Sequence, residues 1–281
     1  MNTAFEKITS RQNPRVQRLA RLRERAARAA ERVFLLEGMR ELERAAAAGV
    51  RFSEFYFCPE LMRGAAAEKI FADARLRLPA EKITELSRPA FEKISYRDRP
   101  EGVLAVAEMR SHALEDLRVP AGTPPLFLVA ESVEKPGNLG ALLRTADSVG
   151  CTALICCGDA GTDVYNPNAI RASQGALFTV PLAVASAEAA RDWLEARGVT
   201  IFAAAPAAEK IYWDCDFRGP AAILAGAEAT GLTDFWLGEN AARDARIVPA
   251  AIPQRGAADS LNVATAAAIF LFEALRQRSR R

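Results

Sequence analysis

The stretch LFLVAESVEKPGNLGALLRTADSVGCTALICC, residues 126–157, decides the fold of the C-terminal half. Two apolar runs in it, Leu126–Ala130 and Ala153–Cys157, have the length and composition of buried strands. The segment from about Asn138 to Val149 has helical composition. A strand, a helix and a second strand in this order form a βαβ unit, so the stretch predicts an α/β domain with a parallel sheet.

The remaining C-terminal sequence continues the α/β pattern. A helix is expected across Asn168–Gly175, which would deliver Phe178, Val180 and Pro181 to a strand. The later expected elements are a strand Ala221–Leu224, a strand Ile247–Ile252 and a closing helix over residues 261–275.

Three polar, glycine-bearing motifs interrupt this apolar sequence. They read NLGALLR (138–144), GAEATGL (226–232) and IPQRGAADSLN (252–262), and each adjoins an apolar run. Polar residues in buried α/β sequence normally stand at the ends of elements, where loops of different strands meet. The motifs therefore predict three loops that converge on one site.

Capping is an alternative explanation for some of these polar residues. Asn138 stands where a helix cap is expected, and Ser260 is a natural N-cap for the closing helix. Asn262, placed inside that helix, is less easily explained in this way. Gly226 permits a backbone turn that a side chain would crowd, and Glu228 needs a partner if it is buried.

Several enzyme classes lack their sequence signals. Neither a GxGxxG dinucleotide motif nor a GxxxxGK[ST] phosphate loop occurs, which disfavours a nicotinamide or ATP enzyme. The chain has one histidine, His112, and five cysteines without a CxxC pair, so a Cys-His or Ser-His-Asp site and a metal site are not expected. No apolar run reaches the roughly 20 residues that cross a bilayer, and the N-terminus lacks the apolar core of a secretory signal. We expect a globular cytoplasmic protein without a metal.

Basic residues gather at the N-terminus, although the whole chain carries a net charge of only +2. Residues 1–32 hold nine Lys or Arg against three Glu, and the run after Pro14 has helical composition with Val16, Leu19 and Leu22 able to share one face. Such a patch is typical of nucleic-acid binding, which makes Arg11, Arg15 and Arg18 candidate RNA ligands. A solvated helix in an arginine-rich protein is the alternative.

The segment between this run and the C-terminal half has the pattern of a small α/β unit. FLLEG, FSEFYFC and EGVLAVAEM have strand character, and MRELERAAAAG and AEKIFADARLRL have helical character. The polar Arg110–Pro125 stretch is typical of a linker. We therefore expect a basic helical extension (1–32), a small α/β domain (33–110), a linker (111–125) and a C-terminal α/β domain (126–281); the resemblance described next implies RNA binding for the second and methyl transfer for the last.

The three motifs, in order and wording, resemble those of the SpoU/TrmH family, the 2'-O-ribose RNA methyltransferases of the SPOUT class. The resemblance implies S-adenosylmethionine-dependent methylation of a ribose 2'-hydroxyl in structured RNA, with ribosomal RNA as the first choice and tRNA as the second. It also implies a deep trefoil knot that holds the cofactor, and a homodimer. The 33–110 segment resembles the small substrate-binding domain of such enzymes, a fold akin to some ribosomal proteins.

Carried over residue by residue, the resemblance places cofactor contacts at Gly226, Ile252 and Leu261. The catalytic candidates that it implies are Arg144, Asn138, Glu228, Ser260 and Asn262. In the family Arg144 is the proposed acceptor of the hydroxyl proton, assisted by an RNA phosphate. Because a guanidinium is a poor base, the alternative is that Arg144 clamps the phosphate while the proton leaves through phosphate or water. Arg171 would contact an RNA phosphate or tie its helix to nearby backbone.

The sequence is also compatible with two other functions. A protein that only binds RNA would use the basic N-terminus but would not need the Asn-Arg-Glu-Ser-Asn set. A small-molecule methyltransferase would keep the cofactor site, but its arginine-rich N-terminus would lack a purpose. The salt dependence of RNA affinity separates these classes.

Overall fold

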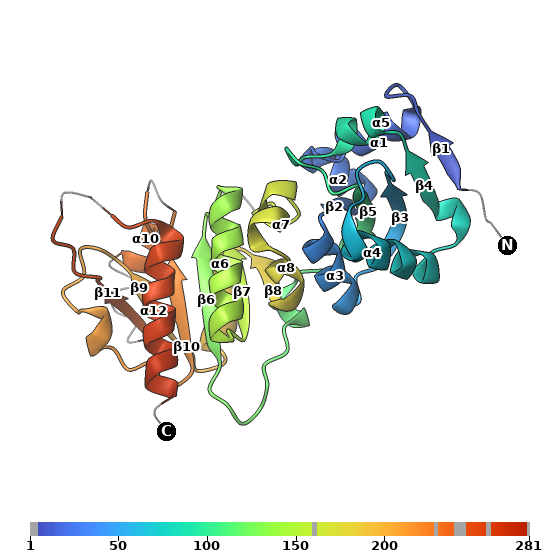
Figure 1. Ribbon diagram of the computed structural model, residues 1–281. Coiled ribbons are helices and arrows are strands. Elements are labelled where there is room, and N and C mark those ends of the chain that lie inside the picture. The colour runs from blue at the N-terminus through green and yellow to red at the C-terminus, as the bar shows by residue number, and fades with distance from the viewer. Residues whose placement is uncertain (1–4, 159–161, 228–229, 239–245, 257–259, 280–281) are drawn as a thin grey trace. The chain divides into compact units, whose positions relative to one another are not determined.

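The computed structural model describes residues 5–158, 162–227, 230–238, 246–256 and 260–279, and Figure 1 shows them as ribbons. The chain forms two compact units. The first contains residues 1–110 and 164–179, and the second contains residues 111–163 and 180–281. The segment 164–179 therefore packs with the first unit, although in the sequence it stands between two strands of the second unit.

The first unit is a five-stranded sheet with helices. Its strands are β1 (Glu6–Ile8), β2 (Val33–Glu37), β3 (Phe52–Phe57), β4 (Ile83–Leu86) and β5 (Val103–Glu108). Its helices are α1 (Pro14–Arg21), α2 (Arg25–Glu31), α3 (Met39–Ala47), α4 (Gly64–Arg77), α5 (Arg88–Ile94), α7 (Pro167–Ser173) and α8 (Ala176–Thr179). The strand order is β1-β4-β3-β5-β2, and β5 runs antiparallel to both of its neighbours. The strands and helices expected between residues 33 and 109 are confirmed.

The basic N-terminal run forms the two helices α1 and α2, in agreement with its helical composition. Val16, Leu19 and Leu22 are fully buried, which confirms that these residues share the inner face. They pack in one core cluster with residues of β2, β4 and α5, such as Leu35, Leu86 and Phe91. Residues 1–32 thus supply part of the hydrophobic core of the first unit.

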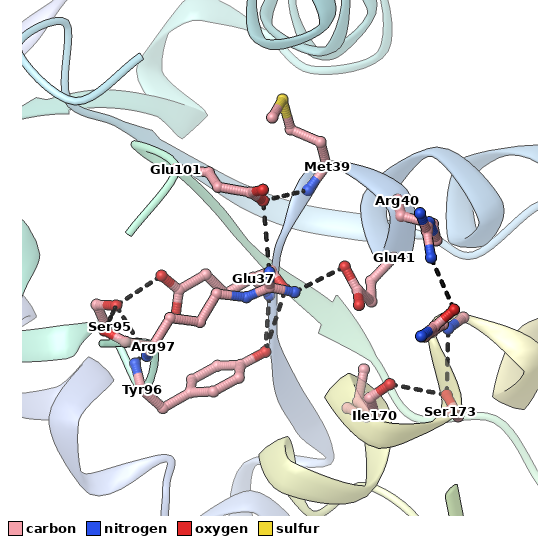
Figure 2. A network of polar contacts seen from close by, with 12 residues as sticks. Glu37, Met39, Arg40, Glu41, Ser95, Tyr96, Arg97, Glu101, Ile170 and Ser173 are labelled. Carbon is pink, nitrogen blue, oxygen red and sulfur yellow. Dashed lines mark hydrogen bonds and ion pairs between the residues drawn. The ribbon is translucent and has the colours of Figure 1, made fainter. Parts of the chain in front are cut away.

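A buried carboxylate stands at the end of β2. Glu37 has no exposed surface, and its oxygens accept hydrogen bonds from Ser95 Oγ at 2.6 Å and from the Tyr96 backbone N–H at 2.9 Å (Figure 2). The Arg97 guanidinium donates to the Glu37 carbonyl at 3.0 Å and to the Glu41 carboxylate at 2.7 Å. Burial raises the pKa of Glu37 above its ordinary value of 4.5, more than these hydrogen bonds lower it.

This pKa shift predicts how stability depends on pH. Because the folded-state pKa of Glu37 is raised, its contribution is fully present below about pH 4.5 and is lost as the pH rises through the folded value, by at most about 1.4 kcal/mol per pH unit. Urea unfolding of the native protein and of Glu37→Gln across pH 4–8 measures the effect. We expect the native protein to lose free energy of unfolding relative to the variant as the pH rises; a constant difference would contradict the prediction.

The second unit is a six-stranded sheet in which every neighbouring pair of strands is parallel, as predicted. Its strands are β6 (Leu126–Glu131), β7 (Ala153–Cys157), β8 (Leu182–Ala185), β9 (Thr200–Ala204), β10 (Ala221–Ala225) and β11 (Ile247–Ala250), in the order β11-β9-β10-β6-β7-β8. Its helices are α6 (Pro136–Val149), α9 (Ala187–Glu195), α10 (Asp234–Leu237) and α12 (Val263–Arg278).

The two faces of this sheet are covered by different helices. Phe127 and Val129 of β6 point into a core cluster with Trp193 of α9 and Trp236 of α10. Helices α6 and α12 lie side by side against the sheet, and their contacts with each other are extensive (Figure 1). Because α6 carries the first motif and α12 begins directly after the third, this packing brings two of the three motifs together.

Some element boundaries differ from the sequence-based expectation. Helix α7 ends at Ser173, and Phe178 lies in the short helix α8 rather than leading into a strand, which begins at Leu182. Strand β11 ends at Ala250, two residues before the expected end. The supposed linker contains the 3-10 turn Leu114–Asp116, whose Leu114 is buried against the core of the second unit.

Candidate functional site

A cavity opens where β9, β10 and β11 end, and we call it the strand-end pocket. It has a volume of about 580 Å³, part of which is open to solvent. Its lining consists of Ala204, Ala205, Pro206, Ala225, Gly226, Ala227, Gly231, Ala250, Ile252, Gln254, Ser260, Leu261, Val263, Ala266 and Phe270. The carboxyl edge of a parallel sheet is where ligands of α/β proteins bind, and an apolar lining with few polar groups is typical of such sites.

The structure brings the three predicted cofactor contacts together at this pocket. Gly226 follows β10, Ile252 follows β11, and Leu261 precedes α12, so the pocket is built from the second and third motifs. Ser260 also lines it and is exposed. Gly226, Ile252 and Leu261, which come from separate stretches of the sequence, thus line the same cavity.

Gly226 occupies a place that no side chain could fill. A Cβ atom there would lie 2.4 Å from the carbonyl carbon and oxygen of Gly231 and 2.5 Å from the Leu232 nitrogen. The loop folds back on itself at this point, because Ala227 and Gly231 exchange two backbone hydrogen bonds of 3.1 and 2.9 Å. Gly231 has a φ of +68°, a conformation that favours glycine. Both glycines of the second motif therefore have a local structural cause.

Asn262 links the first and third motifs. It is the N-cap of α12, since its Oδ1 accepts hydrogen bonds from the backbone N–H groups of Ala264 at 3.0 Å and Thr265 at 3.4 Å. Its Nδ2 donates to Asn138 Oδ1 at 3.1 Å. The expectation that Ser260 caps this helix is therefore wrong, as is the placement of Asn262 inside it. Asn138 is not a cap either, because α6 already begins at Pro136.

Arg144 lies on α6, on the helix that carries Asn138, and its side chain is exposed. Within the part of the chain that the structure describes, its guanidinium forms no ion pair; its backbone carbonyl accepts a hydrogen bond from Ser148 Oγ at 2.8 Å. An exposed guanidinium without a carboxylate partner is available to a phosphate. Glu228, the remaining catalytic candidate, lies outside the described residues.

Sequence reasoning missed a buried carboxylate that holds the second motif. Glu131, the last residue of β6, is 2% exposed. Its two oxygens accept hydrogen bonds from Thr233, at 2.7 Å from the hydroxyl and at 2.9 Å from the backbone N–H. Because Thr233 directly follows the second motif, this contact fixes the loop that forms one side of the strand-end pocket. The available signal was an acidic residue ending an otherwise apolar strand.

Thr233→Val tests the contact between Glu131 and the loop. The substitution keeps the side-chain shape but removes one donor from a buried carboxylate, so we expect the free energy of unfolding to fall by about 1–3 kcal/mol. The control Thr145→Val makes the same chemical change on α6, where the hydroxyl, as far as the described residues go, donates to the Ala141 carbonyl of its own helix and to no other group. Urea unfolding measures the free energy of unfolding of both variants. An equal loss of this free energy in both would show that the contact between Thr233 and Glu131 stabilises the protein no more than an ordinary helix hydroxyl does.

The candidate RNA ligands all belong to the first unit. Arg11 is exposed, but Arg15 pairs with Glu6 at 2.9 Å, and Arg18 pairs with Glu31 at 2.7 Å and with Glu54 at 2.8 Å. Two of these three N-terminal candidates are thus already paired with carboxylates of the same unit. Arg171, in the last turn of α7, is exposed.

Neither a metal-binding cluster nor a membrane-spanning helix occurs among the described residues. The part of the chain that the structure describes contains no cluster of three or more His, Cys, Asp or Glu side chains that could hold a metal ion. Among the same residues, no helix is both long and apolar enough to span a membrane.

Two family models match the chain. The model described as the SpoU rRNA Methylase family matches residues 125–272, and the model described as the MRM3-like substrate binding domain matches residues 13–105. The second match begins within the basic N-terminal run and covers α1 and α2.

Individual proteins resemble the chain over nearly its full length. A 23S rRNA (uridine(2479)-2'-O)-methyltransferase from Streptomyces viridochromogenes is 32% identical, over 98% of this chain and 93% of the relative. A crystal structure of an RNA 2'-O ribose methyltransferase is 40% identical with a TM-score of 0.81, over 97% of this chain and 99% of the other. The AdoMet-bound rRNA methyltransferase from Sinorhizobium meliloti is 31% identical with a TM-score of 0.83, over 97% and 98% of the two chains.

Proposed function

Because the chain belongs to the SpoU rRNA methylase family, we propose that it transfers a methyl group from S-adenosylmethionine to a ribose 2'-hydroxyl of ribosomal RNA. The family predicted from the three motifs is thus confirmed. Relatives named as 23S rRNA 2'-O-methyltransferases support ribosomal RNA over tRNA as the substrate. The observation that carries the proposal is the strand-end pocket, in which Gly226, Ile252 and Leu261 line one cavity.

The strand-end pocket fits S-adenosylmethionine by the chemistry of its lining. Its alanine, leucine, isoleucine and phenylalanine side chains offer an apolar slot for an adenine ring, while the loops leave backbone groups for polar contacts. Gly226 allows the backbone to approach a ligand closely, since no Cβ stands between them. When bound, the cofactor supplies an electrophilic methyl group on a sulfonium, so the protein has chiefly to orient the acceptor and to allow its proton to leave.

Arg144 is the residue that we assign to the acceptor. Its exposed guanidinium binds an RNA phosphate next to the target ribose and thereby orients the 2'-oxygen for in-line attack. The proton then passes to the phosphate or to water. In the alternative route Arg144 itself takes the proton with phosphate assistance, which requires the guanidinium to lose a proton first although it is a very weak acid. Both routes need Arg144 in the same place.

The asparagine pair holds the two helices that frame this site. Asn138 and Asn262 join α6 to the N-terminus of α12, and Asn262 at the same time fixes the first turn of α12. We propose that they keep the Arg144 helix in register with the third motif. Glu228 and Ser260 are proposed to hold Arg144 and the third loop, as the family resemblance implies.

Three finer features complete the proposal. The motif loops form a trefoil knot, the first unit has a fold akin to some ribosomal proteins, and the enzyme acts in the cytoplasm as a homodimer. The homodimer rests on the family resemblance, and Phe272 on α12, with 50% of its surface accessible, is the position at which we test for a second copy packing against this helix. Sedimentation equilibrium of the native protein and of Phe272→Glu tests the dimer: we expect a dimer that the charged variant weakens.

Methyl transfer to defined RNAs tests the function. Purified protein is incubated with labelled S-adenosylmethionine and unmodified ribosomal RNA or tRNA, and the RNA is then hydrolysed in alkali, which spares linkages next to a 2'-O-methyl ribose. We expect label in alkali-stable dinucleotides from ribosomal RNA. Label only from tRNA would identify the second substrate class, and cofactor binding without transfer to either RNA would favour a small-molecule acceptor or a protein that only binds RNA.

A further inference from the structure

The segment 164–179 leaves the catalytic sheet after β7 and packs on the first unit. The Tyr165 ring stacks on Phe34 of β2 with centroids 4.4 Å apart, and the Tyr165 hydroxyl accepts a hydrogen bond from the Arg110 backbone N–H at 2.9 Å. Phe178 stacks on the same Phe34 ring at 6.1 Å. Aromatic packing on Phe34 therefore holds the segment 164–179, which contains α7 and α8, against β2.

The turn between α7 and α8 has an unusual backbone. Gln174 has a φ of +51°, in the left-handed region, where a glutamine side chain is disfavoured. The buried Ser173 closes the turn: its Oγ donates to the Ile170 carbonyl at 2.7 Å and accepts from the Gly175 N–H at 3.2 Å. Ser173 and Gly175 are thus required by the turn itself, but nothing in the turn requires a glutamine at the strained position. Such strain is commonly kept for function.

The Gln174 side chain holds an arginine of α3. Its Oε1 accepts a hydrogen bond of 2.7 Å from Arg40 Nη1. Arg40 is exposed, and among the residues that the structure describes its side chain has no carboxylate partner. The neighbouring Glu41 is already paired with Arg97. The strained glutamine therefore orients a guanidinium without neutralising its charge.

We infer that Arg40, Gln174 and Arg171 form an RNA-contact surface on the first unit, in which the two guanidinium groups bind phosphates of the ribosomal RNA substrate. Arg171 lies one turn before Gln174 on α7, and its exposed guanidinium has no ion-pair partner among the described residues. Planar guanidinium forks suit phosphate oxygens, and the side-chain amide N–H groups of Gln174, which donate to no group within the described ranges, are additional donors. The inference rests on the proposed function, because it names where that substrate is held.

Two arginine substitutions test the surface through RNA binding. Arg40→Gln and Arg171→Gln are each expected to weaken affinity for ribosomal RNA about 10- to 100-fold, and to lower the slope of log affinity against log salt by about 0.7–0.9 per lost phosphate contact. In methyl transfer, KM for RNA rises while kcat and S-adenosylmethionine affinity stay at the native level. The matched control is Arg77→Gln, an exposed arginine of α4 in the same unit that is already paired with Asp73.

Gln174→Gly separates a binding role from a structural one. Glycine accepts the positive φ without strain but cannot hold Arg40, so we expect a melting temperature no lower than that of the native protein together with weaker RNA binding. A lower melting temperature with unchanged RNA affinity would make Gln174 a structural residue and overturn its place in the surface.

The outcomes distinguish this inference from the proposed function. If the native protein methylates ribosomal RNA while both arginine variants keep the native affinity and salt slope, the surface is wrong and the function stands. If the native protein neither binds nor methylates ribosomal RNA, the proposed function fails and the surface fails with it. If Arg77→Gln weakens binding as much as the two variants do, the effect is one of overall charge, and the specific surface is rejected.

Discussion

Arg144→Ala is expected to lower the rate of methyl transfer to RNA by about 100- to 10,000-fold while leaving S-adenosylmethionine affinity close to that of the native protein. The range is typical for removal of a group that positions or deprotonates a reacting hydroxyl. The cofactor contacts are unaffected because Arg144 is not among the residues that line the strand-end pocket. Its exposed position on α6 also makes a large loss of stability unexpected.

Single-turnover methyl transfer and calorimetric titration of S-adenosylmethionine measure the two effects of Arg144→Ala separately. Arg144→Lys keeps the positive charge without the planar fork, so we expect it to recover only part of the rate. Arg218→Ala, which removes an exposed arginine paired with Asp216 at 2.8 Å, serves as the control and should behave as the native protein does. A comparable loss of transfer and of cofactor binding in Arg144→Ala would remove Arg144 from the proposed role.

Gly226→Ala is expected to weaken the binding of S-adenosylmethionine strongly. The new methyl group would lie 2.4 Å from backbone atoms of Gly231, which cannot swing away as a flexible side chain can. Overpacking of this kind costs about 1–3 kcal/mol, and in a loop that lines the strand-end pocket the displacement falls on the ligand site itself. We therefore expect the dissociation constant for S-adenosylmethionine to rise by about 10- to 100-fold.

Gly137→Ala is the matched control for Gly226→Ala. Gly137 belongs to the first motif region, and a Cβ atom there meets nothing within 4 Å among the described atoms. Equilibrium titration of both variants with S-adenosylmethionine gives the comparison, and melting curves show that each is folded. If Gly226→Ala bound S-adenosylmethionine as tightly as the native protein does, displacement of the second motif would not disturb binding. The cofactor contacts would then lie elsewhere.

The apolar pattern of the sequence predicted most of the second unit correctly, because buried parallel strands must be apolar. Ala153–Cys157 was placed to the residue, and the parallel sheet followed from one βαβ unit. The N-cap of α12 was placed at the wrong residue because serine and asparagine cap helices about equally well. What selects Asn262 is its hydrogen bond to Asn138, a residue 124 positions away that local sequence does not reveal.

Long-range contacts also explain the two larger omissions. Glu131 appears in the sequence as the end of a strand, and its role depends on Thr233, 102 positions further along. The order of elements in the sequence predicts that residues 164–179 belong to the C-terminal domain, because they follow its first motif in the chain. Their aromatic packing on Phe34 joins them to the first unit, and pairing between distant aromatic rings leaves no periodic signal.

The packing of Tyr165 and Phe178 on Phe34 limits how this gene can be divided. Phe34 is 1% exposed, and two of the rings that cover it are encoded more than 120 codons downstream. A fragment that stops at Arg110 would leave this aromatic surface uncovered in water, which disfavours its expression as a separate domain. Transplanting the first unit into another enzyme therefore requires two coding segments, and during synthesis its core is completed only after the ribosome has passed codon 178.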